Sequence, residues 1–168
     1  PHAGDIMLLR KDADGNGQPD AVVTLISGLK RPLGMDIAGG YLYIAESHQI
    51  GRVPFDSATG KLAGAYEPLV EGFTDDGNHW SKTLAFGPDG KLYFNIGAPC
   101  NICIPPDTHA NISRINPDGT GFEYFAHGVR NSVGFDWQPQ TNALYATDFG
   151  RDLLGDDFPP CELNLVRQ

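Results

Sequence analysis

The sequence predicts an all-β protein, and within that class a β-propeller built from four-stranded blades. The first observation is a repeat, because the pair Leu-Tyr occurs at 42–43, 92–93 and 144–145, in steps of 50 and 52 residues. The second is that these pairs lie among short apolar segments separated by turn residues, with no segment typical of a long helix. A four-strand unit at this period is typical of a propeller, whereas a β-sandwich predicts no such period.

Each repeat is expected to begin with an apolar strand and a turn, followed by the strand that contains the Leu-Tyr pair. The first strands are expected at 33–38, 83–87 and 133–137. Apolar and polar residues alternate in KLYFNIG (91–97) and NALYATD (142–148), and this alternation predicts the second strand.

A third and a fourth strand complete each repeat. The third strand is expected at 50–60, 112–121 and 162–168, and the opening segment at 5–15 matches it. The fourth strand is expected at 21–29, 65–73 and 122–129. Residues 1–168 therefore carry about three blades in one partial propeller domain, with no separate second domain.

Three blades do not close a propeller, because closed propellers typically have about 4–8 blades. An open array leaves two apolar blade faces exposed, which favours association or aggregation. We therefore expect this chain to be the central part of a larger propeller. Further segments of the protein, or another chain, are expected to supply the missing blades.

The composition is that of a soluble globular protein and excludes some partners. The 168 residues are 40% hydrophobic and 20% charged, with a net charge of −9. This charge argues against nucleic-acid or anionic-membrane binding as the main activity. No apolar run approaches the roughly 20 residues of a membrane span.

The three cysteines favour one local disulfide. Cys100 and Cys103 enclose two residues in CNIC, while Cys161 stands in PPCELN. Because neither a second cysteine pair nor a following histidine completes the motif, zinc and haem sites are disfavoured. A disulfide in an exported protein, periplasmic or secreted, is the favoured interpretation. Two free thiols are the alternative, and the sequence leaves the state of Cys161 open.

The connection between successive repeats carries charged residues at matching positions. It is GLKRPLG at 28–34 and GVRNSVG at 128–134, while the middle copy at 72–86 is longer and contains His79. Equivalent loops of a propeller lie on one face around the central channel. We therefore expect one face to gather Lys30–Arg31, His79 and Arg130–Asn131. For His79 the alternative is a packed histidine at a blade edge, and for Lys30–Arg31 a solvated pair at the rim is favoured.

Two longer strings resemble a known family. HWSKTLAFGPDGKLYFNIGAPCNIC (79–103) and INPDGTGFEYFAHGVRNSVGFDWQPQTNALYATDFGRDLLGDD (115–157), with ELN at 162–164, are similar to soluble pyrroloquinoline-quinone-dependent sugar dehydrogenases. The resemblance is strongest to the L-sorbosone dehydrogenase-like and aldose dehydrogenase-like branch, and it extends from about residue 28 to residue 164. GVRNSVG and TDFGRDLLGDD are its most specific parts.

The resemblance implies a six-bladed propeller that oxidises a sugar hydroxyl or aldehyde, with hydride transfer to pyrroloquinoline quinone (PQQ). It places His79 as the catalytic base, since an imidazole with an ordinary pKa near 6.5 takes up a proton at neutral pH. It places Arg130 over the quinone carboxylates and Asn131 against the quinone oxygens. It assigns the backbone carbonyls of Gly150 and Arg151 to a calcium ion that polarises the quinone.

The chain departs from the family pattern at two positions. Asn78 replaces the acidic residue of the glucose-oxidising members, and Phe149 stands where a polar residue is expected near the cofactor. The family's later basic residues, which hold the quinone carboxylates, fall after Gln168. We therefore expect this chain alone to bind the cofactor incompletely.

A second calcium site is suggested by DADGNGQPD. Asp12, Asp14, Asn16 and Asp20 occupy positions 1, 3, 5 and 9 of a calcium-binding loop. Position 12 is Val23 and not glutamate, so an EF-hand is excluded. A polar hairpin turn is the favoured alternative to a weak structural calcium site.

Two other function classes stay open. One is a non-catalytic propeller that binds a sugar or a protein, which the apolar Phe149 supports. The other is a calcium-dependent lactonase-like hydrolase, for which the candidate ligands are Asp36, Asn95, Asp136 and Asp148. The sequence does not determine the substrate, the electron acceptor or the oligomeric state.

Overall fold

The computed structural model describes residues 4–75 and 77–167, and its strands form a row of antiparallel sheets. A hairpin of β1 (Ile6–Leu9) and β2 (Val22–Ile26) comes first. Blade 1 contains β3 (Met35–Ala38), β4 (Tyr41–Ala45), β5 (Gln49–Asp56) and β7 (Glu67–Glu71), with the short β6 (Lys61–Leu62) paired to the end of β5. Blade 2 contains β8 (Leu84–Phe86), β9 (Leu92–Ile96), β10 (Asn111–Ile115) and β11 (Glu123–His127). Blade 3 contains β12 (Phe135–Trp137), β13 (Leu144–Asp148) and β14 (Glu162–Val166).

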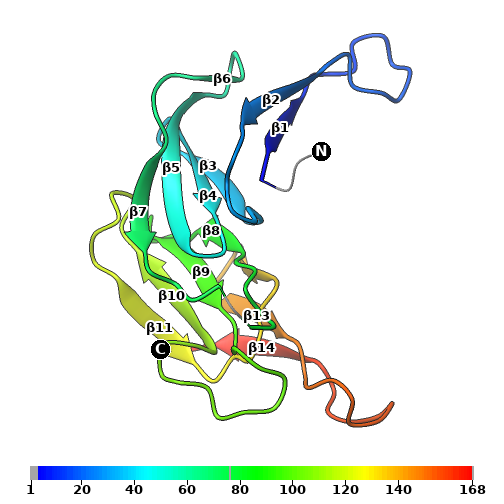
Figure 1. The fold of residues 1–168 in the computed structure, drawn as a ribbon, viewed down its shortest axis with the longest axis vertical. Coiled ribbons are helices and arrows are strands. Elements are labelled where there is room, and N and C mark those ends of the chain that lie inside the picture. Colours follow the sequence, from blue (N-terminus) through cyan, green and yellow to red (C-terminus); the bar gives the residue numbers. More distant parts are fainter. Residues whose placement is uncertain (1–3, 76, 168) are drawn as a thin grey trace.

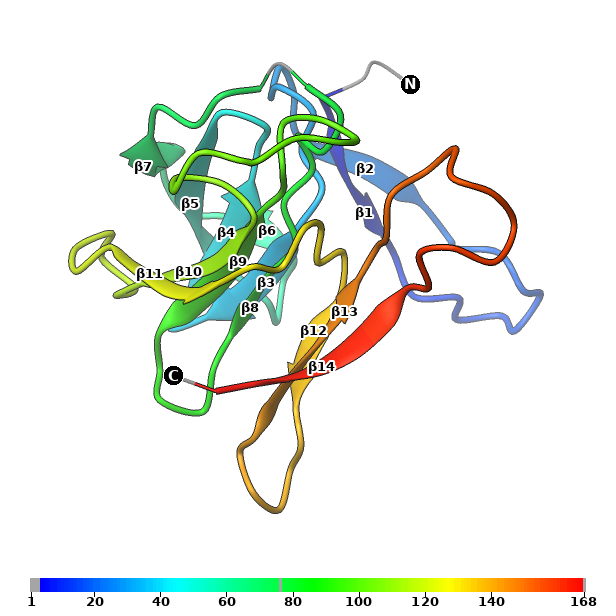
Figure 2. The same cartoon turned by 90° about the horizontal axis from the view of Figure 1, so that it is seen from below.

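This arrangement confirms the predicted β-propeller of four-stranded blades. Consecutive strands pair antiparallel in sequence order in blades 1 and 2, and the β1–β2 hairpin corresponds to the third and fourth strands of a preceding blade. Figures 1 and 2 show the sheets following one another in a row, with successive blades packed side by side. The first strands β3 and β8 of neighbouring blades contact each other. No helix long and apolar enough to cross a membrane occurs in the described residues.

The core lies between the blades. A tyrosine at the same repeat position closes each interface, with Tyr43 and Tyr93 only 2% and 3% exposed. The Tyr43 ring packs edge-on against Phe86 of the next blade, and the Tyr93 ring packs edge-on against Trp137, with ring centroids 4.8 Å and 5.0 Å apart. Such edge-to-face pairs contribute about 0.5–1.5 kcal/mol beyond the area they bury.

The far face of blade 3 lacks such a neighbour among the described residues. Tyr145, which corresponds to Tyr43 and Tyr93, is 38% exposed, and Leu163 and Leu165 of β14 are exposed beside it. The burial of β13 therefore alternates along the strand, as predicted. By contrast, the alternation predicted for 91–97 does not appear as alternating burial, because blades 1 and 3 cover both faces of β9 and bury all five of its residues.

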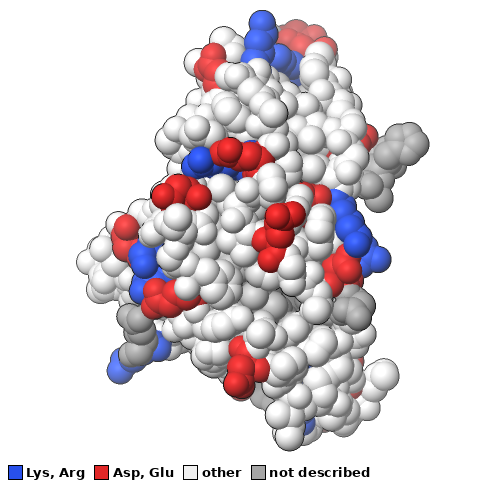
Figure 3. Space-filling model, turned by 60° about the vertical axis from the view of Figure 1, so that its left-hand side comes forward, with Lys and Arg blue, Asp and Glu red and all other residues white. Residues whose placement is uncertain are grey.

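Some charged side chains take part in contacts between blades, and others pair within a sheet. Several form ion pairs across neighbouring strands, such as Arg52 with Glu67 and Arg114 with Glu123. On the face drawn in Figure 3, acidic and basic groups lie in small clusters, often side by side, between wide uncharged areas. That face carries no continuous basic surface of the kind that binds nucleic acid.

Candidate functional site

The loops that join one blade to the next are built on one plan in two of their three copies. All three begin at a glycine with positive φ, Gly28 at 81°, Gly72 at 89° and Gly128 at 85°, but loops 28–34 and 128–134 also share their length and the way they are held. In this left-handed conformation a Cβ atom is disfavoured, so glycine is the favoured residue at the start of each loop.

A carboxylate from the end of the second strand holds each of these two loops. Glu46 accepts a hydrogen bond from the backbone N–H of Lys30 at 2.5 Å. Asp148 accepts the N–H groups of Arg130 and Asn131 at 2.9 Å and 2.7 Å. Both acids stand four residues after the leucine of a Leu-Tyr pair, so the repeat contained the signal for this role, but it was not predicted.

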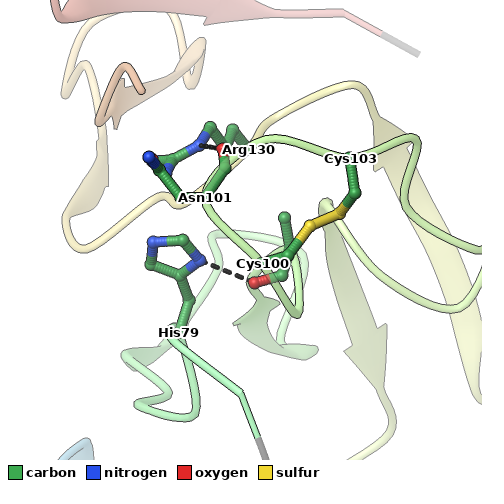
Figure 4. The surroundings of a disulfide bond; sticks show 6 residues. His79, Cys100, Asn101, Cys103 and Arg130 are labelled. Carbon is green, nitrogen blue, oxygen red and sulfur yellow. Dashed lines mark hydrogen bonds between the residues drawn. A yellow bond between two sulfur atoms is a disulfide. The ribbon is translucent and has the colours of Figure 1, made fainter. Parts of the chain in front are cut away.

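The side chain of His79 is oriented by a backbone carbonyl. Its Nδ1 lies 2.6 Å from the oxygen of Ala98, a bond marked by a dashed line in Figure 4. A carbonyl oxygen only accepts, so Nδ1 carries the proton and the neutral ring keeps its lone pair on Nε2. The N–H of Ala98 in turn donates to the carbonyl of Arg130 at 2.8 Å. One peptide segment thus connects the loop of His79 to the loop of Arg130.

The guanidinium of Arg130 is held by oxygens that carry no formal charge. Its Nε donates to the carbonyl of Asn101 at 3.3 Å, and one Nη donates to the Asn101 side-chain oxygen at 2.9 Å (Figure 4). The other Nη donates to the carbonyls of Phe149 and Gly150 at 2.9 Å and 2.7 Å. No carboxylate of the described chain forms an ion pair with Arg130. Its charge therefore remains available to attract an anion.

Asn131 is buried, and one of its side-chain atoms has no partner. Its Oδ1 makes no hydrogen bond with the described residues, although the residue is only 8% exposed. A Cβ on Gly97 would lie 2.5 Å from the His79 Cβ and 3.0 Å from this Oδ1. His79 and Asn131 therefore lie against the same glycine, and a larger residue there would displace one of them. Two predicted site residues from different blades thus come together.

Lys30 and Arg31 do not join this group directly. Lys30 forms an ion pair with Asp75 in the middle loop, and this contact lowers the pKa of the Asp75 carboxyl below its usual value. Arg31 stacks over the ring of Trp80, with its guanidinium carbon 5.0 Å from the ring centroid. Both residues brace the loop that carries His79, and Lys30 is largely exposed.

Lys82 is a residue of this region that the sequence did not single out. Its ammonium is buried and donates to the carbonyls of Ser47 at 2.6 Å and Trp80 at 3.2 Å. Burial lowers the pKa of Lys82 to about 8. A lysine directly before an apolar first strand was the available signal.

The CNIC segment is closed by a disulfide between Cys100 and Cys103, whereas Cys161 is free and exposed. A cavity of about 170 Å³ lies between this segment and Arg130, and its lining includes Ala98, Asn101 and Arg151. A second hollow of about 280 Å³ is also lined by Arg130, together with Phe149 and Gly150. Arg130 thus lines both hollows.

The predicted calcium ligands fall into two groups. The carbonyl of Gly150 already accepts the bond from Arg130, so a cation occupies this oxygen in the present arrangement. In the 12–20 loop, the carboxylates of Asp12, Asp14 and Asp20 lie within 4.8 Å of one another. Asp12 accepts the N–H of Gly17, which contributes most to lowering its pKa. The Asn16 side-chain oxygen accepts the N–H of Gln18.

The side chains proposed as calcium ligands of a lactonase accept hydrogen bonds from backbone N–H groups instead. Asp36 accepts the N–H of Phe86 from the next blade at 2.8 Å, and Asn95 accepts the N–H of Thr83 at 2.6 Å. Asp136 accepts the N–H of Trp137, and both oxygens of Asp148 are engaged as described above. The only group of three metal-ligating acids, histidines or cysteines found in the described residues is the 12–20 loop.

Comparison with known proteins shows the fold. No protein-family model matches the chain. Over 80 residues, or 48% of its length, it is 46% identical to an uncharacterized protein of Borreliella burgdorferi, of which the match covers 21%.

Three solved structures illustrate the likeness. A calcium structure of a Trichoderma reesei Carbohydrate-Active Enzymes Family AA12 protein has a TM-score of 0.80 at 18% identity, over 96% of this chain and 47% of that one. The holo PQQ domain of a Coprinopsis cinerea pyranose dehydrogenase has a TM-score of 0.76 at 17% identity, over 92% and 42%. A PQQ-bound aldose sugar dehydrogenase of Streptomyces coelicolor has a TM-score of 0.64 at 22% identity, over 98% and 54%.

The chain therefore has the fold of quinone-dependent sugar dehydrogenases. It spans about half the length of the solved structures that it matches.

Proposed function

We propose that this chain forms part of a PQQ-dependent sugar dehydrogenase that oxidises a sugar hydroxyl or aldehyde. The observation that carries the proposal is the bond from His79 Nδ1 to the Ala98 carbonyl, which leaves Nε2 free as a base. Gly97 lies against both the Cβ of His79 and the side-chain oxygen of Asn131, so the two residues are neighbours. The fold of the PQQ-bound neighbours supports the same class of cofactor.

The residues present fit an anionic, oxygen-rich cofactor. PQQ carries three carboxylates and an ortho-quinone. The charge of Arg130 is not neutralised by a carboxylate of the described residues, and a guanidinium binds carboxylates strongly. Asn131 has a buried amide whose oxygen, an acceptor, lacks a partner and suits a ligand N–H, while its amide nitrogen can donate to a ligand oxygen. When bound, the quinone supplies the acceptor for a hydride.

The chain itself supplies the proton acceptor and the orientation. His79 Nε2 takes the proton of the sugar hydroxyl, and the Ala98 carbonyl stabilises the resulting imidazolium through Nδ1–H. Arg130 and Asn131 would hold and orient the cofactor. No step is assigned to calcium, because the Gly150 carbonyl is bound to Arg130.

The missing blades and the location of the protein belong to the same proposal. Tyr145 repeats the position of Tyr43 and Tyr93, which each pack against an aromatic residue of the next blade. We propose that another four-stranded blade covers Tyr145. The Cys100–Cys103 disulfide supports a periplasmic or secreted protein, because disulfides persist in oxidising compartments.

Dye reduction with aldoses, PQQ and calcium tests the activity. His79→Ala is expected to lower turnover by about 10²–10⁴-fold, the usual contribution of a general base. His127→Ala is the matched control, because His127 is an exposed histidine on the outer strand of blade 2. Equal turnover in the wild-type protein and the His79 variant would refute His79 as the base.

The second candidate is a propeller that binds sugars without redox chemistry. The side chain of Phe149 is 49% exposed beside Arg130, which places an apolar surface next to the proposed cofactor site. Sugar binding that needs no quinone and persists in His79→Ala would favour this function over the dehydrogenase.

A further inference from the structure

We propose that Asn101 is the positioning residue for Arg130, and that the Cys100–Cys103 disulfide fixes Asn101 in place. The geometric part of this inference stands on its own, while its consequence for cofactor binding rests on the proposed function. Asn101 lies between the two cysteines, so the disulfide closes a short ring around it (Figure 4).

The contacts of Asn101 join two distant loops. Its backbone carbonyl and its side-chain oxygen both accept hydrogen bonds from the guanidinium of Arg130. The same side-chain oxygen accepts the N–H of Asp152 at 2.8 Å, and its amide nitrogen donates to the Asp152 carbonyl at 2.9 Å. Asn101 therefore holds Arg130 from one side, while the carbonyls of Phe149 and Gly150 hold it from the other.

The geometry of Arg130 depends on this pair of contacts. Two acceptors on one residue direct Nε and one Nη together, which fixes the plane of the guanidinium. Without Asn101, the bonds to Phe149 and Gly150 leave the side chain free to pivot about the other Nη. The charge would then no longer face one direction. Ordering the side chain on binding would reduce the affinity for an anion.

The disulfide restricts the conformations of the loop that carries Asn101. A loop closed by a covalent bond has fewer backbone conformations to lose when it forms its contacts. Ala98 lies two residues before Cys100. Its carbonyl accepts from His79, and its N–H donates to the carbonyl of Arg130. Cys103 is exposed, so a dithiol can reach the disulfide. Reduction by dithiothreitol transfers two electrons and two protons, which breaks the S–S bond and yields two thiols and oxidised dithiothreitol.

Proton–nitrogen NMR of the arginine Nε–H groups tests the positioning role without any enzymatic activity. We expect the Arg130 Nε–H signal to be protected from solvent exchange in the wild-type chain and to lose at least tenfold of that protection in Asn101→Ala. Arg114 provides the internal control, because its Nε and Nη2 bind Glu123 at 3.0 Å in a region away from Asn101. Unchanged protection of Arg130 with an intact Arg114 signal would overturn the proposal.

Two further samples separate the possible causes. Asn101→Asp keeps the oxygen that accepts from Arg130 but adds a negative charge, so it should keep the protected signal and weaken PQQ binding about tenfold in calorimetry. Dithiothreitol should lower the protection of the Arg130 Nε–H in the folded wild-type chain. This test needs no variant, so it holds even if Asn101→Ala fails to fold. The double variant Cys100→Ser and Cys103→Ser should not respond to it. A dithiothreitol-treated chain with unchanged protection would refute the role of the disulfide.

The quinone measurement distinguishes this inference from the proposed function. If the Arg130 signal depends on Asn101 but the full-length protein that contains this chain binds no PQQ, the positioning role holds and the dehydrogenase proposal fails. If PQQ binds with equal affinity to wild type, Asn101→Ala and Asn101→Asp, the consequence for cofactor binding fails and the cofactor assignment survives, while the NMR result alone decides the geometric part.

Discussion

Loops 28–34 and 128–134 have the same backbone arrangement but differ in the contacts of their charged side chains. Each starts at a glycine with positive φ, and each is tied down by a carboxylate from the second strand of its own blade. In the first loop, Lys30 pairs with Asp75, so its charge is neutralised within the chain. In the second loop, Arg130 is bound only by uncharged oxygens.

This difference shows how a repeat acquires a site. The blade repeat fixes where each loop leaves one sheet and enters the next, and it does so in both copies. What differs is whether the side chains find partners inside the protein. Arg31 rests on Trp80, whereas the buried Asn131 at the same loop position keeps an oxygen without a partner. The unsatisfied copy is the one expected to bind a ligand.

The largest expected effect separates Arg130 from Lys30. Arg130→Ala should weaken PQQ binding about 100-fold, since a charge-assisted contact to a carboxylate is lost. Lys30→Ala removes the equivalent residue and should change the affinity less than about threefold, because that charge serves Asp75. Isothermal titration of both variants makes the comparison, and equal losses would show that the two loops do not differ in function.

The two loop-holding acids should matter equally for stability. Asp148→Ala leaves the N–H groups of Arg130 and Asn131 without their acceptor, which should lower the unfolding free energy by about 2–4 kcal/mol. Glu46→Ala should cost a similar amount, because Glu46 also binds Tyr66 at 2.9 Å. Urea unfolding measures both. Only Asp148→Ala is expected to weaken PQQ binding, and a loss of binding in both variants would count against the distinction between the loops.

Asn131 and Arg31 form the next matched pair. Asn131→Ala should weaken PQQ binding about tenfold, which is the effect of one or two lost hydrogen bonds in a buried site. Arg31→Ala should leave the affinity unchanged and loosen the packing on Trp80, which tryptophan fluorescence reports. A variant order opposite to this one would place the site at loop 28–34.

The last prediction concerns Lys82, whose ammonium binds the carbonyl of Ser47. Its pKa is about 8 in the folded chain against 10.5 for the free side chain. Between these values the unfolded chain binds more protons, so the unfolding free energy should rise with pH, by about 1–2 kcal/mol from pH 7.5 to 9.5. Lys82→Met should remove this rise. Urea unfolding at several pH values checks it, and identical profiles for both proteins would contradict the burial of a charged amine.

Much of the fold could be predicted because it repeats. The Leu-Tyr pairs marked the second strand of every blade, and the turns around them gave the other strands. The continuous burial of β9 could not be obtained from its alternating residues, because it depends on blades covering both faces. The exposure of Tyr145 followed from the expected open face.

The site was predictable only in part. The sequence proposed His79, Arg130 and Asn131 as site residues, and the structure brings His79 and Asn131 to the same glycine. The direction of the Ala98 carbonyl, which fixes the His79 tautomer, depends on local loop geometry that no residue type encodes. The contact between Asn101 and Arg130 spans 29 residues and depends on how a disulfide shapes its loop, which residue spacing does not specify.

Hydrogen–deuterium exchange with and without PQQ tests the central claim most directly, since it compares the two loops in one experiment. We predict that PQQ slows exchange in loop 128–134 and in the segments around His79 and Ala98, and leaves loop 28–34 unchanged. Equal protection of both loops, or protection confined to loop 28–34, would contradict the claim that only the second copy of the repeat became a binding site.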